Sequence, residues 1–188
     1  MTANVRMIDV SSNNHPTAAP IDWAQVKAAG YGAVMIKATE GVDYVNPWLK
    51  DDADGAAAAG LQVGYYHFAR PGQSTGVTQA ADATKAIDGL PRQLGLALDL
   101  EVTEGRSWPE LAAWARGFHE RAKALVEHSP LYVNDYFLAN LPGAPFDWWL
   151  WLAQTARPRR QVWAWQETTP VAVPGIGGLT DVGWLHPR

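Results

Sequence analysis

Two carboxylates follow a short apolar segment in the sequence L-G-L-A-L-D-L-E-V-T-E-G, residues 94–105. Asp99 and Glu101 are two positions apart, so the period of a strand places them on one face. Leu98 and Leu100 then point to the other face, toward the layer beneath the helices. Two like charges that are buried together cost free energy and raise each other's pKa. This pattern favours a catalytic pair over a solvated strand end.

A pair of acids on either side of a bond is the arrangement used for glycoside hydrolysis. One acid must hold a proton for the leaving oxygen, while its neighbour stays ionised to stabilise the developing positive charge. Glu101 lies farther along the strand and has the longer side chain, so we assign it as the general acid, with Asp99 as the partner carboxylate. Repulsion from Asp99 and Asp9 is expected to raise the pKa of Glu101.

Short apolar segments recur along the chain and alternate with helical segments as far as residue 141. The pattern predicts strands at 7–11, 32–38, 61–69, 94–101, 130–134, 148–153, 160–166 and 178–182. It predicts helices at 22–30, 46–60, 77–89, 107–128 and 135–141, and Ser107 with Glu110 forms a capping-box pattern at the fourth of these.

Strand–helix alternation favours a parallel α/β sheet, and eight strands suggest closure into a barrel. A complete (β/α)₈ barrel takes about 250 residues. The three last strands follow one another without full helices, which accounts for a chain of only 188 residues. We therefore expect one domain over residues 1–188, an irregular TIM-like barrel of the form (β/α)5(β)3.

The carboxyl ends of parallel barrel strands face the active site, so polar side chains near strand ends are the candidates for function. Four are carboxylates that we predict to be catalytic: Asp9, Asp99, Glu101 and Asp181. Others are predicted to bind substrate: Lys37, Glu40, Tyr66, Tyr132, Asn134, Trp151, Trp165 and Gln166. Lys37 and Glu40 have the alternative of a salt bridge at the barrel mouth. Two or three of the ten tryptophans are expected to stack on sugar rings.

Composition excludes several classes of protein. A net charge of −4 argues against nucleic-acid binding, and no apolar segment is long enough to span a membrane. The chain has no cysteine, which excludes disulfides, thiolate metal sites and a cysteine nucleophile. The five histidines form no paired metal-binding motif, so we predict no metal and no cofactor, and this counts against a metal-dependent deacetylase. We expect a monomer.

The segment G-Q-S-T-G (72–76) matches the G-x-S-x-G motif of serine hydrolases. A nucleophile elbow runs directly from a strand into its serine, whereas Arg70 and Pro71 intervene here. We therefore interpret the segment as a loop. His67 is interpreted as a structural histidine that hydrogen-bonds to its neighbours.

Several segments together carry a family resemblance. They are I-D-V-S (8–11), I-D-W-A-Q-V-K-A-A-G (21–30), I-K-A-T-E-G-V-D-Y-V-N-P (36–47), A-A-G-L-Q-V-G-Y-Y-H-F-A-R-P (58–71), L-D-L-E (98–101), W-L-A (151–153), W-A-W-Q (163–166) and G-L-T-D (178–181). In order and spacing the chain resembles glycoside hydrolase family 25, the muramidases often called Chalaropsis-type lysozymes, over nearly its whole length. The segment S-S-N-N-H-P (11–16) departs from the tyrosine- or tryptophan-containing loop expected there, which leaves the nearby sugar subsite undefined.

The resemblance implies a barrel of eight strands with five helices. It implies cleavage of the β-1,4 bond between N-acetylmuramic acid and N-acetylglucosamine in bacterial peptidoglycan. By motif, Glu101 matches the family's proton donor and Asp99 its partner carboxylate. Asp9 and Asp181 match two further acids of the cleft, and Tyr66 and Gln166 match positions lining the substrate groove.

Several alternatives stay open at this point. The product can retain its configuration, through the substrate's N-acetyl group, or invert it, through water. A non-catalytic wall-glycan-binding module on the same barrel is the alternative function, although such a module is expected to lack an acid. Action at the bacterial cell wall is expected, and no ordinary signal peptide is visible. This fits a phage lysin released from the host cytoplasm, a toxin effector, or a mature or excised secreted domain.

Overall fold

Eight strands form the closed wall of a barrel in the computed structural model, which describes residues 4–143, 150–155, 158 and 161–186. The wall strands are β1 (Val5–Val10), β2 (Ala33–Glu40), β4 (Gln62–Phe68), β5 (Leu96–Asp99), β6 (Leu131–Asn134), β7 (Leu150–Ala153), β8 (Ala164–Gln166) and β10 (Leu179–Leu185). Their order is β1-β10-β8-β7-β6-β5-β4-β2, and pairing of β1 with β2 closes the barrel. The short strands β3 (Tyr44–Val45) and β9 (Val171–Ala172) pair with β2 and β10. The predicted barrel is confirmed.

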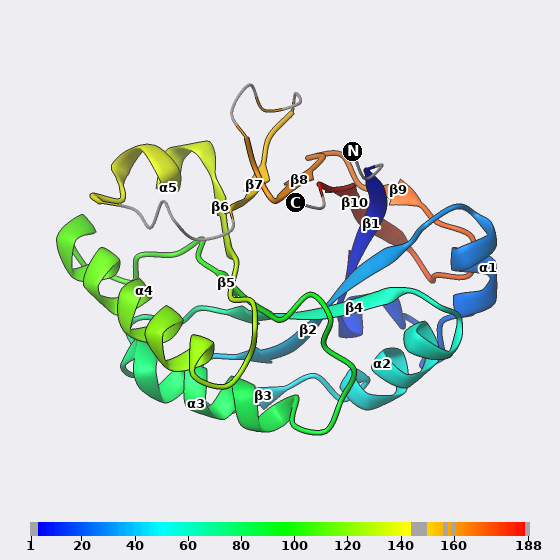
Figure 1. The fold of residues 1–188 in the computed structure, drawn as a ribbon, viewed down its shortest axis with the longest axis horizontal. Coiled ribbons are helices and arrows are strands. Elements are labelled where there is room, and N and C mark those ends of the chain that lie inside the picture. The colour runs from blue at the N-terminus through cyan, green and yellow to red at the C-terminus, as the bar shows by residue number, and fades with distance from the viewer. Residues whose placement is uncertain (1–3, 144–149, 156–157, 159–160, 187–188) are drawn as a thin grey trace.

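The last wall strand runs against the expected direction. Strand β10 is antiparallel to both of its wall neighbours, β1 and β8, so the sheet is mixed rather than wholly parallel. The connection from β8 to β10 contains β9 and no helix, and antiparallel strands need no helical crossover between them. Figure 1 shows β1 and β10, from the two ends of the chain, lying side by side.

Five α-helices cover part of the outside of the barrel (Figure 1). They are α1 (Trp23–Ala28), α2 (Leu49–Ala58), α3 (Gly76–Ala86), α4 (Trp108–Lys123) and α5 (Asp135–Asn140), with a short 3₁₀ helix η1 (Ser12–Asn14) after β1. Among the described residues after α5 the structure contains strands and loops. The helical coverage is therefore uneven, as the spacing of the sequence predicts.

Local hydrogen bonds set where the helices begin. The predicted capping box of α4 is present, since Glu110 accepts from the Ser107 backbone N–H at 2.9 Å. Helix α2 begins later than predicted because the Asn46 side chain makes other bonds. It donates to the Lys37 carbonyl at 2.8 Å and accepts from the Trp48 N–H at 3.1 Å. Among the described residues, no helix has both the length and the apolar composition needed to cross a membrane.

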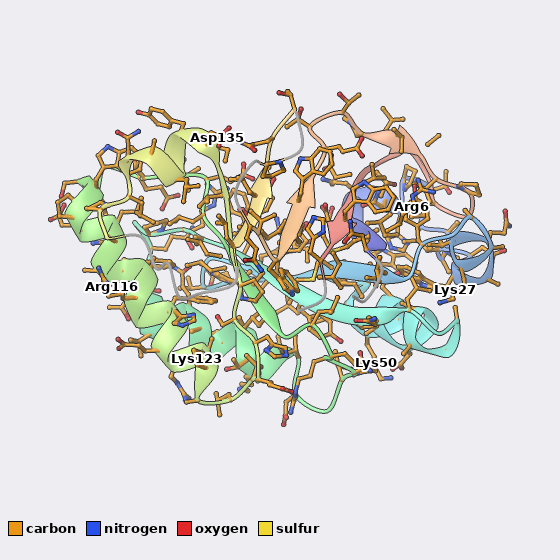
Figure 2. The ribbon with its side chains drawn as sticks, turned by 45° about the horizontal axis from the view of Figure 1, so that its top comes forward. Arg6, Lys27, Lys50, Arg116, Lys123 and Asp135 are labelled. Atoms are coloured by element: carbon orange, nitrogen blue, oxygen red, sulfur yellow. The ribbon has the colours of Figure 1, made fainter. Side chains whose placement is uncertain are left out.

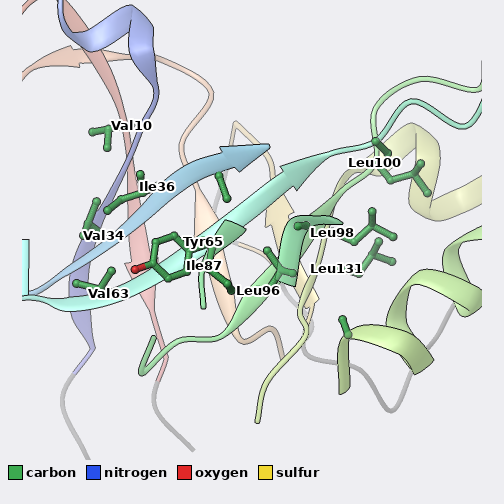
Figure 3. Close-up of a cluster of buried hydrophobic side chains, with 14 of the residues drawn as sticks. Val10, Val34, Ile36, Val63, Tyr65, Ile87, Leu96, Leu98, Leu100 and Leu131 are labelled. Carbon is green, nitrogen blue, oxygen red and sulfur yellow. The ribbon is translucent and has the colours of Figure 1, made fainter. Parts of the chain in front are cut away.

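The two faces of the barrel wall carry two separate apolar clusters. The outer cluster lies between the sheet and the helices and includes Leu98, Leu100 and Leu131, each at most 1 % exposed (Figure 3). The inner cluster fills part of the barrel interior with Met7, Met35, Ala97, Trp151, Trp163 and Leu185 among its members. The alternation predicted for Leu98 and Leu100 is thus confirmed. Asp99 lies between these two leucines and belongs to the opposite face.

Candidate active site

A cavity of about 390 Å³ lies on the inner face of the wall strands. Sixteen of the described residues line it: Asp9, Ser11, Asn13, Asn14, Lys37, Tyr66, Phe68, Asp99, Glu101, Tyr132, Trp151, Gln166, Pro170, Leu179, Thr180 and Asp181. The set includes all four predicted acids and five of the eight predicted substrate-binding residues. Figure 2 shows Lys27, Lys50, Arg116 and Lys123 on helices at the periphery of the molecule, and none of them lines the cavity.

The four acids reach the cavity from three wall strands and one loop. Asp9 of β1 is directly opposite Asp181 of β10 in the antiparallel register, which places their Cβ atoms roughly 5 Å apart. Asp99 is the last residue of β5 and is only 7 % exposed. Glu101 was expected on the same strand, but β5 ends at Asp99, so Glu101 lies in the following loop and is exposed. It therefore reaches the open part of the cavity.

Removal from water raises the pKa of each acid. For Asp9 burial raises the pKa well above its usual value, and the charges of Asp181 and Glu101 add to the effect. For Asp99 burial again raises the pKa well above its usual value, followed by repulsion from Glu101 and Asp9. Burial also raises the pKa of Asp181. The four acids therefore cannot all be ionised at neutral pH without a large cost in folding free energy.

The raised pKa of Glu101 has a different cause from the one expected. Partial burial raises the pKa of Glu101 first, the hydrogen bond from the Tyr132 hydroxyl lowers it, and the charge of Asp181 raises it. A hydrogen bond with Asp99 also lowers the pKa of Glu101, whereas the sequence predicts that repulsion from Asp99 raises it. A hydrogen bond between two carboxyl groups requires a proton between them. The pKa values of Asp99 and Glu101 therefore depend on each other, because a proton held by one of them makes ionisation of the other less costly.

Three aromatic rings pack together in the cavity wall. Tyr132 and Trp151 meet edge to face, with ring centroids 4.7 Å apart, and Tyr66 meets Trp151 at 6.4 Å. Trp151 is 2 % exposed and Tyr132 is 8 % exposed, so both rings are largely covered. Burial raises the pKa of Tyr66 well above its usual value, and nearby Asp9 adds to this, so Tyr66 keeps its proton.

Three polar atoms of the cavity lining are buried without a hydrogen-bond partner among the described residues. They are Trp151 Nε1, Asp99 Oδ1 and Gln166 Oε1. A buried polar atom without a partner is costly in free energy, and such atoms concentrate where a ligand is bound. One N–H donor and two oxygen acceptors at this cavity are thus left for a polar ligand.

Three predicted substrate-binding residues do not line the cavity. Trp165 lies on the outward side of β8, packs against the outer cluster and donates from Nε1 to the Gln154 carbonyl at 3.0 Å. Its neighbour Gln166 points inward, as strand alternation requires. Asn134 caps α5 by accepting from the Phe137 N–H at 3.0 Å.

Glu40 is the third of these residues. It pairs with Lys37 at 2.5 Å and accepts from Arg70 Nε at 2.8 Å. The predicted alternative of a salt bridge at the barrel mouth is therefore confirmed for Lys37 and Glu40. Lys37 still lines the cavity, and its side chain is 16 % exposed.

The loop that carries Glu101 is fixed by polar contacts to the loop after β4. Glu104 accepts from the Gly72 N–H at 2.7 Å and pairs with Arg70 at 3.3 Å. Arg106 donates to the Pro71 carbonyl from both Nε and Nη2, at 2.9 and 2.7 Å. These contacts fix the loop on which Glu101 lies.

Sequence reasoning missed several lining residues after β1, at the end of β4 and near the C-terminus. They are Ser11, Asn13, Asn14, Phe68, Pro170, Leu179 and Thr180. A signal existed for two of them: Ser11 is two positions after Asp9, and Leu179 is two positions before Asp181, so each shares a strand face with an acid. Phe68 ends β4 two positions after Tyr66 and shares its face as well, whereas Thr180 lies between two such positions on β10. Asn13, Asn14 and Pro170 lie outside the strands, where the period of a strand gives no signal.

The rival chemistries find no support in the described part of the chain. His67 is fully buried, and its ring nitrogens lie 2.8 Å from Thr39 Oγ1 and 2.8 Å from Gln79 Oε1, which confirms its structural role. In the G-Q-S-T-G segment Thr75 caps α3, so the segment is a loop leading into a helix. Within the described ranges, no cluster of three His, Cys, Asp or Glu side chains has a metal-binding arrangement.

Comparison with known proteins places this site in a family. The model of the glycosyl hydrolases family 25 matches residues 8–176. The autolytic lysozyme of Clostridium acetobutylicum is 33 % identical over 86 % of this chain and 51 % of its own length. The N,O-diacetylmuramidase of Chalaropsis sp. is 32 % identical over 65 % of this chain and 64 % of its own length. The chain thus spans about half to two thirds of these curated relatives.

Solved structures agree with the sequence comparison. The bacterial lysozyme from Streptomyces coelicolor superimposes with a TM-score of 0.84 at 27 % identity, covering 100 % of this chain and 94 % of the other. The family GH25 lysozyme from Aspergillus fumigatus superimposes with a TM-score of 0.81 at 25 % identity, covering 99 % and 95 %. The barrel, its cavity and the matched sequence lead to one assignment: this chain belongs to glycosyl hydrolases family 25.

Proposed function

We propose that the chain is a muramidase that hydrolyses the β-1,4 bond between N-acetylmuramic acid and N-acetylglucosamine in bacterial peptidoglycan. The observation that carries this is the Asp99–Glu101 pair, two acids with raised pKa values at the wall of a cavity that four acids line. Family membership and relatives named lysozyme and N,O-diacetylmuramidase support the choice of substrate. Peptidoglycan is accordingly the proposed partner, and the bacterial cell wall the proposed place of action.

Glu101 is the proposed general acid. It is the exposed member of the pair, and therefore the one that reaches a glycosidic oxygen in the cavity. As the bond to the leaving sugar breaks, the proton passes from Glu101 to that oxygen. Asp99 is then left ionised beside the sugar, where its charge stabilises the positive charge that develops on the anomeric carbon and ring oxygen.

Asp9 and Asp181 form a second acid pair across the β1–β10 ladder. Their raised pKa values allow one of the two to keep a proton and donate a hydrogen bond to the bound sugar. The ionised member adds negative potential to the same side of the cavity. This arrangement favours a cationic transition state over the neutral substrate, which is the requirement for lowering the barrier.

Two routes to the product are compatible with this set of acids. The acetamido oxygen of the substrate can attack the anomeric carbon, with Asp99 accepting a hydrogen bond from its N–H, and the configuration is then retained. Alternatively an acid activates water on the opposite face, and the configuration is inverted. Proton NMR of the fresh product distinguishes the routes, since they give different anomers.

The principal test is a digest of purified peptidoglycan, reduced with borohydride and analysed by mass spectrometry. Reduced muramic acid ends are expected from the wild type. The variant Glu101→Gln is expected to keep its fold and glycan affinity and to lose about 10²–10⁴-fold in kcat, as general acids contribute. Glu120→Gln, at an exposed position on α4, is the matched control and should cleave normally.

Other outcomes of this digest contradict the proposal in different ways. Reduced glucosamine ends keep glycosidase chemistry and overturn the bond assignment. Normal cleavage by Glu101→Gln overturns the assignment of the general acid. Binding without new ends supports the alternative, a glycan-binding module on the same barrel.

We further propose that residues 1–188 act as one catalytic domain and as a monomer. All sixteen residues lining the cavity belong to a single barrel, so no second chain is needed to complete the site. Release as a phage lysin and secretion as a processed domain both deliver such a domain to the wall. Sedimentation of the purified chain tests the oligomeric state.

A further inference from the structure

One residue that lines the cavity is apolar and exposed, unlike the acids around it. Leu179 is 63 % exposed, although it lines a cavity that holds four carboxylates. Exposed large apolar side chains of this kind mark binding sites when they lie in a cleft rather than singly on an open surface. A ligand that presents an apolar face to Leu179 would remove this side chain from water.

The register of β10 explains why Leu179 faces the cavity. Leu179 and Asp181 are two positions apart and share one face of the strand. Thr180 between them also borders the cavity, but it is only 1 % exposed, and its hydroxyl accepts from Asn14 Nδ2. Leu179 pairs with Ala172 of β9, and the exposed Pro170, just before β9, also lines the cavity. Leu179 and Pro170, which we call the apolar rim, thus lie on one hairpin.

The apolar rim has a fixed backbone. Asn14, which is 7 % exposed, donates from Nδ2 to the Leu179 carbonyl and to Thr180 Oγ1, each at 3.3 Å. The Asn14 side chain is itself held, since its Oδ1 accepts from the Ser11 N–H at 2.9 Å. Leu179 is therefore presented to solvent from an ordered strand and not from a free loop.

The aromatic residues of the cavity do not offer an exposed apolar surface comparable to that of Leu179. The rings of Tyr132 and Trp151 are largely covered by each other and by the inner cluster. The ring of Phe68 lies under two cations, Lys37 and Arg70, each 5.0 Å from its centroid. Among the described residues Trp151 is the tryptophan that lines the cavity, and it is covered, so it does not provide an exposed stacking surface; Trp148 and Trp149 lie outside the described residues.

We propose that the apolar rim is a sugar subsite of the glycan strand, in which Leu179 and Pro170 pack against the C–H face of a pyranose ring. A pyranose presents axial C–H groups on one face and hydroxyls at its edge, so an aliphatic rim opposite a polar wall matches both. The inference rests on the proposed muramidase function and adds a residue that determines substrate affinity. Leu179 touches no reacting atom in this scheme, and it acts on binding.

The test compares Leu179→Asn with Leu125→Asn. Leu125 is a matched control, because it is an exposed leucine at 47 % and does not line the cavity. With soluble uncross-linked peptidoglycan strands, Leu179→Asn is expected to raise KM about tenfold and to leave kcat within about twofold, as loss of one apolar contact does. Leu125→Asn should match the wild type, and Leu179→Met, which keeps an apolar side chain, should restore KM.

Binding measurements separate failure of this inference from failure of the proposed function. Calorimetric titration of the same glycan strands into Glu101→Gln, with and without Leu179→Asn, needs no turnover. Weaker binding caused by Leu179→Asn supports the subsite even if the wild type forms no new ends. Equal affinity and equal KM with and without Leu179→Asn overturn it, as does an equal loss in Leu125→Asn.

Discussion

The outer and inner faces of the barrel wall differ in the side chains they bury: the outer face buries apolar side chains, and the inner face buries acids. Leu98 and Asp99 are adjacent in β5, yet Leu98 packs in the outer cluster and Asp99 lines the cavity. On the outer face, burial of an apolar side chain stabilises the fold. On the inner face, burial of an acid raises its pKa and destabilises the ionised form. Because side chains alternate along β5, one residue stabilises the fold and the next lines the proposed active site.

The same contrast applies to titration. The acids of the inner face have raised pKa values, so the folded state binds their protons more tightly than the unfolded chain does. The stability that these protons contribute is complete below about pH 4 and is lost as the pH rises through the folded pKa. On the outer face, burial lowers the pKa of His67 to about 4. Its contribution has the opposite dependence on pH.

Truncation on the outer face should have the largest effect on stability. Leu98→Ala removes a side chain that is 1 % exposed, and it is expected to lower the free energy of unfolding by about 3 kcal/mol. Urea unfolding measures this change. The kcat of the remaining folded enzyme should be unchanged, because Leu98 points away from the cavity. A large fall in kcat at full folding would contradict the separation of the two faces.

Neutralising Asp99, which follows Leu98 in β5, should have the reverse effect: it should lower activity without lowering stability. Asp99→Asn is expected to lower kcat about 100-fold, or about 2.7 kcal/mol in barrier height, because it removes the partner of Glu101. The free energy of unfolding at pH 7 should equal or exceed that of the wild type, and the gain should grow as the pH rises. Steady-state rates and urea unfolding at several pH values test both statements.

Asp88→Asn is the matched control for this substitution, since the Asp88 side chain is 85 % exposed. It should change neither quantity. A variant Asp99→Asn that is clearly less stable than the wild type at high pH would show that the carboxylate contributes structure as well as chemistry.

Protonation of His67 should lower the free energy of unfolding in mild acid, by less than Leu98→Ala does. Gln79 Oε1 only accepts, so the neutral ring donates from Nε2 and accepts at Nδ1 from the Thr39 hydroxyl. Protonation of Nδ1 breaks this arrangement. With a pKa of about 4 in the folded state against about 6.5 in the unfolded chain, stability is lost as the pH falls below 6.5.

At pH 5 the loss from His67 amounts to about 2 kcal/mol relative to pH 7. The difference in unfolding free energy between the wild type and His67→Gln, followed from pH 7 to pH 5, isolates this effect from the opposite trend of the acids. A difference that does not change with pH would mean that His67 titrates normally.

Much of the difference between the outer and inner faces of the wall was predictable from the sequence, because it depends on local patterns. The alternation of Leu98, Asp99, Leu100 and Glu101 is local, and the pleat converts it directly into two faces. The capping box at Ser107 is equally local. The pairing of Glu40 with Arg70 is not local and could not be predicted, because it joins residues 30 positions apart. The antiparallel direction of β10, and with it the position of Leu179, depends on a connection whose path no short pattern specifies.

Trp165 provides the smallest test, because it is a predicted substrate-binding residue that does not line the cavity. The substitution Trp165→Phe removes the donor to the Gln154 carbonyl and part of the packing against the outer cluster, at an expected cost of about 1 kcal/mol in unfolding free energy. KM and kcat should stay at the wild-type values, because Trp165 lies on the outward side of β8. The matched variant Trp151→Phe removes an indole N–H that lines the cavity without a partner among the described residues, so it should raise KM. If Trp165→Phe raised KM instead, Trp165 would contact substrate as the sequence predicts, and β8 would not divide its two faces as its neighbours do.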